Sequence, residues 1–132
     1  MDNTIIEVLK KTLKDIEGRG DTLTRNGYYM KGALVEKEPL ITNDMLEEKR
    51  LHMLFSIIPL IFKTSERKTV GSYGSKHLVA RFFNHQYFSN GEFIIVMIAL
   101  GYKYKVRKDS INVTFYGSWV DTADQELKYK FM

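Results

Sequence analysis

The sequence contains no cysteine and only two prolines among its 132 residues. The lack of cysteine excludes a disulfide-stapled secreted scaffold, a cysteine-ligated zinc or iron–sulfur site and a cysteine nucleophile. A long apolar run is also missing: the longest, Leu51–Phe62, has twelve residues, whereas a bilayer span needs about 20. The polar start Met1–Thr4 is unlike a secretory signal peptide. These absences predict an intracellular protein that is neither exported by a signal peptide nor embedded in a membrane.

Neither sign of charge dominates the whole chain, but the basic residues are concentrated in one region. The formal net charge is +4. Residues 1–65 hold ten basic and ten acidic side chains, whereas residues 66–108 hold eight basic and two acidic ones. A local basic excess is typical of a surface that binds a polyanion, and it is also typical of a solvated face that keeps a protein soluble. Both interpretations stay open at this point.

Apolar residues recur at helical spacing in four segments, which are 4–17, 44–59, 75–84 and 90–100. The second helix is expected to break or kink at Pro59, because the proline ring clashes with the carbonyl four residues earlier. The fourth helix starts with Ser89 and Glu92 at capping-box spacing. Its core, Phe93–Leu100, is apolar on every side, which predicts a helix buried at the centre of the fold.

Alternating polar and apolar residues predict strands in the last third of the chain. Residues 102–107 and 111–116 are expected to pair as a hairpin with its turn at 108–110, and residues 126–131 to add a further strand. Nearer the N-terminus, Asn26–Gly27 is a strong type I′ turn signal. It predicts a short hairpin over residues 23–31.

Together these elements predict an α+β fold in one domain covering residues 1–132. Four helices are expected to pack on one face of a small antiparallel sheet whose other face is solvated and basic. Within this domain, residues 1–62 form a helical N-terminal part and residues 63–71 an exposed linker loop. Residues 72–132 form a helix-helix-hairpin core, in a helix-turn-helix-hairpin arrangement.

Three short segments have a pattern in common with a group of viral proteins. They are Ser72–His77, Tyr87–Ile94 and Gly101–Tyr102. Over residues 72–117 the chain resembles small uncharacterised proteins of phages and large DNA viruses. The resemblance implies a viral or mobile-element origin, with a role on nucleic acid or in the virus particle, and it implies no specific activity.

Motifs for catalysis and for metal binding are absent or incomplete. The segment Gly71–Lys76 has the glycines and the lysine of a phosphate-binding loop, but a serine separates Gly74 from Lys76, so the Walker spacing is missing. The three histidines have no metal-ligand spacing, and there is no nucleophile-elbow motif. We therefore predict no catalytic residue, no cofactor and no metal site, and a protein that is not an enzyme.

The order of elements from residue 75 to 116 is that of a winged-helix DNA-binding domain. A recognition helix must present polar side chains to base edges, however, and Phe93–Leu100 presents none. The solvated face of the sheet is the better candidate for a nucleic-acid interface, with Lys103, Lys105 and Arg107 on one side of their strand. The complete candidate set is Lys103, Lys105, Arg107 and Lys108 from the hairpin, Lys76 and Arg81 from the exposed face of the third helix, and Tyr116 as a stacking ring.

The leading hypothesis is a small binding protein that contacts nucleic acid weakly and without sequence preference through its basic hairpin. The alternative is a structural or protein-interaction subunit, such as a minor virion component, that uses its aromatic-rich surface against another protein. A homo-oligomer stays open under either hypothesis. If the protein is viral, the expected location is the host cytoplasm or the virion.

Overall fold

The computed structural model describes residues 3–35 and 38–120, and the strand expected over residues 126–131 lies outside them. The fold is α+β, with four α-helices and two small antiparallel sheets in the part of the chain described. In chain order the elements are α1 (Asn3–Gly18), β1 (Thr22–Leu23), β2 (Tyr28–Tyr29), a 3₁₀ turn (Met45–Glu47), α2 (Lys49–Ile61), β3 (Phe62–Gly71), α3 (Ser72–Ala80), a second 3₁₀ turn (Arg81–Phe83), α4 (Asn90–Ala99), β4 (Tyr104–Arg107) and β5 (Ser110–Trp119).

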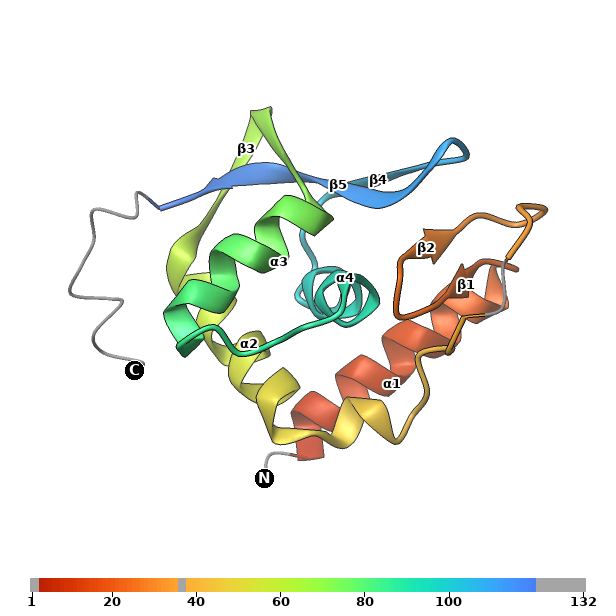
Figure 1. Ribbon diagram of the computed structural model, residues 1–132, viewed down its shortest axis with the longest axis horizontal. Helices are drawn as coiled ribbons and strands as arrows, with labels where there is room; N and C mark the ends of the chain where they lie inside the picture. Colours follow the sequence, from red (N-terminus) through yellow and green to blue (C-terminus); the bar gives the residue numbers. More distant parts are fainter. Residues whose placement is uncertain (1–2, 36–37, 121–132) are drawn as a thin grey trace.

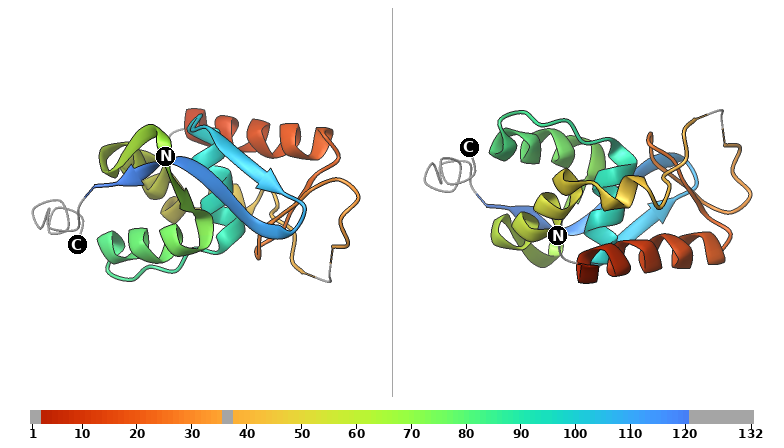
Figure 2. Two further views of the ribbon diagram at one scale, coloured as in Figure 1. Left: turned by 90° about the horizontal axis from the view of Figure 1, so that it is seen from above. Right: turned by 90° about the horizontal axis from the view of Figure 1, so that it is seen from below.

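The larger sheet forms one layer of the molecule and the helices lie beneath it (Figure 1). Its strand order is β3-β5-β4, and both pairings are antiparallel. Seen from above, β5 crosses over α4, while α1 and α3 lie on opposite sides of that helix (Figure 2). The predicted packing of helices on one face of a sheet is therefore confirmed, and the β1–β2 hairpin forms a second, two-stranded sheet.

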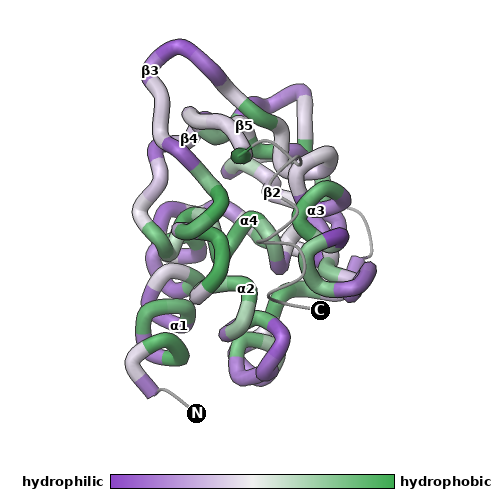
Figure 3. Tube along the Cα trace, turned by 90° about the vertical axis from the view of Figure 1, so that its left-hand side faces the viewer, coloured by the Kyte–Doolittle hydropathy of each residue, from purple (hydrophilic) through white to green (hydrophobic). Residues whose placement is uncertain are grey.

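The prediction of a linker loop over residues 63–71 is wrong, because this segment is strand β3. Phe62 pairs with Trp119 at one end of β3, and Gly71 pairs with Thr114 at the other. Between Thr64 and Thr69 the register shifts, and residues 65–68 leave the ladder as a polar excursion (Figure 3). The sequence resembled a loop because these residues are charged and solvated, as they can be on an edge strand interrupted by a bulge.

Two local predictions also fail in their details. Pro59 lies inside α2 and the helix continues to Ile61, so the helix does not break at the proline, and a kink there stays a prediction. The hairpin around Asn26–Gly27 forms, but neither residue has a positive φ, so its turn is not type I′. Instead Thr24 Oγ1 accepts hydrogen bonds from the N–H groups of Asn26 and Gly27, at 3.1 and 3.2 Å. These hydrogen bonds to the Thr24 side chain thus stabilise a turn that differs from the type I′ turn favoured by Asn-Gly.

Helix α4 is the centre of the fold, as its apolar sequence predicts. The run Phe93–Met97 has no exposed surface, and α4 packs against α1, α2 and α3. The prediction of full burial to Leu100 is wrong for its last three residues, because residues 98–100, at the end of the helix, are half-buried. At its first turn Gly91 approaches the backbone of the β1–β2 loop so closely that its N–H donates to Arg25 O at 3.0 Å. A Cβ built on Gly91 would collide with the carbonyl of Thr24. The first turn of α4 therefore requires glycine for close backbone contact.

A buried ion pair joins the start of α4 to α2. Ser89 Oγ accepts from the Glu92 N–H at 3.2 Å, and Glu92 Oε1 accepts from the Ser89 N–H at 2.8 Å, which completes the predicted capping box. The Glu92 carboxylate also receives both Nη groups of Arg50, Oε1 from Nη1 at 3.0 Å and Oε2 from Nη2. Burial by itself would raise the pKa of Glu92, but the hydrogen bonds and charge of Arg50 and the bonds from Ser89 bring it below its usual value.

The close contact at Gly91 predicts a large difference between two helical glycines. We expect Gly91→Ala to destabilise the protein by about 3 kcal/mol or more, because the new methyl must displace the β1–β2 loop. Gly74→Ala is the matched control: Gly74 lies in α3 with open space around it. That change should be neutral or stabilising by up to about 1 kcal/mol. Urea unfolding of the two variants measures both effects, and equal stabilities would contradict the packing described.

The buried carboxylate predicts a specific pH dependence. The folded-state pKa of Glu92 lies below its unfolded value of about 4.3, so its contribution to stability is present above that pH and is lost as the pH falls through the folded pKa. Glu92→Gln should cost about 2 kcal/mol at pH 7 and lose less stability on acidification than the wild type.

Glu48→Gln is the control, because it removes the other carboxylate that pairs with Arg50. Glu48 is exposed, and its Oε2 lies 2.6 Å from Arg50 Nε. This control should cost at most about 1 kcal/mol. A Glu92→Gln variant whose unfolding free energy follows the wild-type pH profile would refute the role given to the pair.

Candidate nucleic-acid interface

The two faces of the larger sheet differ sharply in polarity. Along β5, Val113, Phe115 and Gly117 are buried against the helices, while the residues between them are exposed or half-buried. Along β4 the side chains of Lys105 and Arg107 are exposed and those between are half-buried. The alternation predicted for the hairpin is therefore confirmed. We call the face turned away from the helices the outer face.

Tyr116 occupies the middle of the outer face because β5 is the central strand. Lys103, directly before β4, lies next to it: its O accepts from the Tyr116 N–H at 3.0 Å, and its Nζ lies 4.8 Å from the centre of the Tyr116 ring. Lys105 pairs with Thr114, two residues along β5 in one direction, and Lys63 pairs with Ser118, two residues along in the other. Successive outer-face positions are about 7 Å apart. Three lysines therefore surround one half-exposed aromatic ring.

The excursion of β3 adds charges of both signs beside this ring. It rises from the sheet on the side away from the helices (Figure 1) and is held by Ser65 Oγ, which accepts from the N–H groups of Arg67 and Lys68 at 3.1 and 3.0 Å. Both of these basic side chains are exposed. Glu66 reaches across to Lys103, with Oε2 3.2 Å from Nζ, and both side chains stay largely exposed. The acidic residue partly neutralises the face that the lysines make basic.

Three basic residues near the outer face were not predicted as part of the interface. Lys63, Arg67 and Lys68 were assigned to a linker, so their proximity to the hairpin was missed. Pairing of β3 with β5 brings them there. In the sequence of this segment, the available signal for a strand was a single apolar residue, Val70, between residues that are not apolar. One such position is too few to distinguish a strand from a loop.

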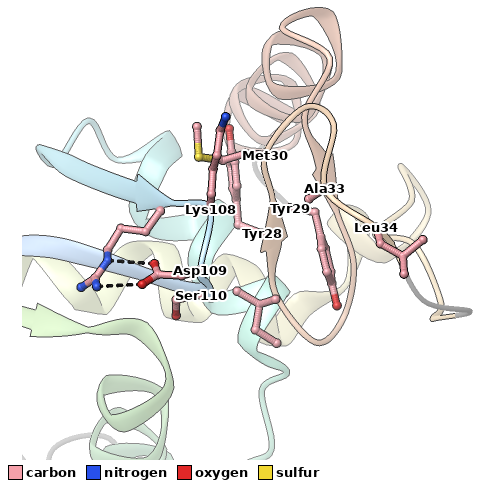
Figure 4. A pocket seen from close by; sticks show the side chains of 10 residues that line it. Tyr28, Tyr29, Met30, Ala33, Leu34, Lys108, Asp109 and Ser110 are labelled. Carbon is pink, nitrogen blue, oxygen red and sulfur yellow. Dashed lines mark hydrogen bonds and ion pairs between the residues drawn. The ribbon is translucent and has the colours of Figure 1, made fainter.

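At the tip of the β4–β5 hairpin, one of the two basic residues predicted to contact phosphate already has an acidic partner. Both Nε and Nη2 of Arg107 lie 3.2 Å from the Asp109 carboxylate, and these bonds lower the pKa of Asp109. Lys108 is exposed. Both basic residues line an open hollow of about 540 Å³ between the hairpin tip and the segment around Tyr29 (Figure 4). Arg107 is therefore a weaker candidate for a phosphate contact than Lys105.

The structure separates Lys76 and Arg81 from the other candidates. Both lie in the helical layer beneath the sheet, where α3 is fixed to β5 by Ser72 Oγ, which accepts from the Val113 N–H at 3.0 Å. Arg81 is exposed there, as expected. The prediction that Lys76 lies on a solvated helix face is wrong, because only 7% of this residue is exposed. The helix begins three residues earlier than predicted, and the segment after it folds back over the lysine.

Residues 3–35 and 38–120 contain neither a candidate metal site nor a candidate membrane-spanning helix. No group of three histidine or acidic side chains in these ranges is arranged to hold a metal ion. No helix in them is long and apolar enough to cross a membrane.

Comparison of the chain with protein-family models, with curated proteins and with solved structures finds no match. Its function must therefore be inferred from the geometry of its own residues. The features that this geometry offers are the outer face of the sheet, the hollow at the hairpin tip and the surroundings of Lys76.

Proposed function

We propose that the protein is a non-enzymatic binding protein that contacts single-stranded nucleic acid, without sequence preference, through the outer face of its three-stranded sheet. The observation that carries the proposal is the arrangement of Lys63, Lys103 and Lys105 around the half-exposed ring of Tyr116. A basic face that follows the backbone, combined with an aromatic ring on which a base can stack, is the usual means of binding single strands.

A single strand suits this face better than a duplex read through its major groove. Major-groove readout requires a helix or ribbon that presents polar side chains to base edges. In the helix-turn-helix-hairpin arrangement predicted for the C-terminal part, α4 would be the reading helix, yet Phe93–Met97 is fully buried. Lysines on a sheet make contacts with phosphates that carry no sequence information. We therefore expect little sequence preference.

The lysines of the outer face differ in whether an acidic side chain competes with phosphate for their ammonium group. Lys105 and Lys63 are exposed, whereas Lys103 faces Glu66. An exposed ion pair of this kind is worth about 0–1 kcal/mol, so a phosphate can replace the carboxylate at low cost. The proposed interface is thus weak and strongly dependent on salt. A viral or phage origin, implied by the resemblance over residues 72–117, is compatible with this function and stays a prediction.

Charge reversal on the outer face tests the proposal directly. The variant Lys63→Glu, Lys103→Glu and Lys105→Glu should remain folded, because none of these side chains packs in the core. It should lose binding of a labelled single-stranded oligonucleotide at low salt, measured by fluorescence anisotropy. For the wild type, a plot of log affinity against log salt should have a slope of roughly −2 to −3, from about 0.7 for each phosphate contacted.

The matched control reverses three exposed lysines of the helical layer, Lys11→Glu, Lys14→Glu and Lys49→Glu. Both triple variants have the same net charge, but the control leaves the outer face unchanged. A difference in affinity between them therefore does not come from total charge. It should bind the oligonucleotide much more tightly than the outer-face variant. Equal loss in both variants, or no binding by the wild type at about 50 mM salt, would overturn the proposal.

The pairing of Glu66 with Lys103 predicts a gain of affinity on removing a carboxylate. Glu66→Gln should tighten binding about twofold to threefold at low salt. In the wild type, a phosphate must first displace Glu66 from Lys103, and an exposed ion pair of this kind is worth about 0.5 kcal/mol. The substitution should also make the salt dependence steeper. Glu7→Gln, which makes the same charge change on the exposed side of α1, should leave the affinity unchanged. A weaker Glu66→Gln variant would argue against Lys103 as a contact.

The predicted alternative, a protein-interaction subunit, rests on a different surface. Met53 and Leu60, one above the other on α2, are 50% and 58% exposed. An apolar strip on a helix can pack against another protein. An apolar interface barely responds to salt, so failure of the oligonucleotide tests together with salt-insensitive association would favour this function.

A further inference from the structure

A second hollow, separate from the proposed strand-binding face, surrounds the ammonium group of Lys76. It has a volume of about 610 Å³ and is formed by residues from the β1–β2 loop, α3, the segment before α4 and the start of β5. The residues that line it are Arg25, Asn26, Tyr73, Lys76, His77, Tyr87, Asn90, Ile111 and Asn112. None of these is acidic, and Arg25 and Lys76 are cations.

Lys76 has a largely buried side chain whose ammonium group opens onto the hollow and has no ion-pair partner among the described residues. Its Nζ lies 5.2 Å from the centre of the Tyr73 ring and 5.0 Å from that of Tyr87. Among the described residues it makes no ion pair. The carboxylate of Glu92 acts on it through space, but that group is already bonded by Arg50 and Ser89. The surrounding residues partly remove this ammonium group from water, at a cost in free energy that an anionic ligand would offset.

A further feature of the hollow points to the kind of anion. The residues Tyr73 and Tyr87 are 55% and 59% exposed, so each offers an aromatic surface for a planar group. Asn90 is 4% exposed, and its Nδ2 donates to Asn26 O and Asn112 Oδ1, both at 2.8 Å. These bonds join the start of α4 to the β1–β2 loop and to β5 beside the hollow, whereas the Asn90 Oδ1 is enclosed and is not accessible from the hollow. The hollow thus combines positive charge with aromatic surface.

We propose that this hollow binds a nucleoside 5′-monophosphate group. The phosphate meets Lys76 and Arg25, and the base lies against one of the tyrosine rings. A phosphate monoester carries nearly two negative charges at neutral pH, which matches the two cations. The same chemistry is presented by a free mononucleotide and by the 5′-phosphorylated end of a strand. The proposal does not depend on binding at the outer face.

Calorimetric titration of the full chain with adenosine 5′-monophosphate tests the proposal. Lys76→Met keeps the length of the side chain and removes the charge, and it should weaken binding about tenfold or more. Tyr87→Ala changes an exposed ring and should weaken binding of the nucleotide but not of inorganic phosphate. The outer-face triple variant should retain binding at about 0.15 M salt, where charges more than about 8 Å apart are largely screened. Failure of this proposal and failure of the proposed function are therefore distinguishable.

Two oligonucleotides of one sequence, with and without a 5′-phosphate, distinguish the sources of the ligand. Competition with the mononucleotide by the phosphorylated form alone identifies a strand end, and competition by neither identifies the free nucleotide. The proposal is overturned if no binding is detected at about 1 mM nucleotide, if inorganic phosphate binds equally well, or if Lys76→Met binds like the wild type. Tryptophan fluorescence reports folding of that variant, because Trp119 Nε1 donates to Ser75 Oγ at 2.9 Å, next to Lys76.

Discussion

The bidentate pair between Arg50 and Glu92 is the interaction on which the rest of the structure depends. Glu92 closes the capping box of α4 and at the same time receives the guanidinium of α2, so one carboxylate fixes both the start of the central helix and its position against its neighbour. Arg50 Nη1 also lies 3.3 Å from the carbonyl of Tyr87, in the segment that leads into α4. An ion pair of this kind need not add net stability over an apolar core, but it specifies a single arrangement because Glu92, with 1% of its side chain exposed, would be an unpaired buried charge without Arg50.

That arrangement decides which surfaces are available for function. With α4 enclosed by three helices and the sheet, its apolar run Phe93–Met97 cannot meet a ligand. The polar face of the sheet and the edge of the helical layer remain. The first collects lysines around Tyr116, and the second collects Lys76 and two tyrosines at the place where the segment after α3 turns back toward α4. Both surfaces therefore combine cations with aromatic rings, and different parts of β5 contribute to each.

Prediction from the sequence succeeded where one local pattern determines one element. Four helices, the two hairpins and the burial of Phe93–Met97 follow from periodicity, capping and turn residues. It failed where distant residues decide. Residues 63–71 form a strand because β5 offers a partner, and Lys76 is buried because Tyr87, eleven positions further along, folds over it. The hairpin lysines were found by alternation alone, whereas Lys63 belongs to the same face through strand pairing that no local pattern contains.

The central claim is that the outer face of the sheet binds a single strand, and a residue-resolved titration tests it most directly. Two-dimensional NMR spectra of the labelled protein, recorded during addition of a single-stranded oligonucleotide, locate the contact without any substitution. We expect the amide signals of Lys63, Lys103, Lys105 and Tyr116 to shift together and to return toward their starting positions as salt is added. Shifts confined to the exposed strip of α2 around Met53 and Leu60, or no shifts at all, would contradict the account.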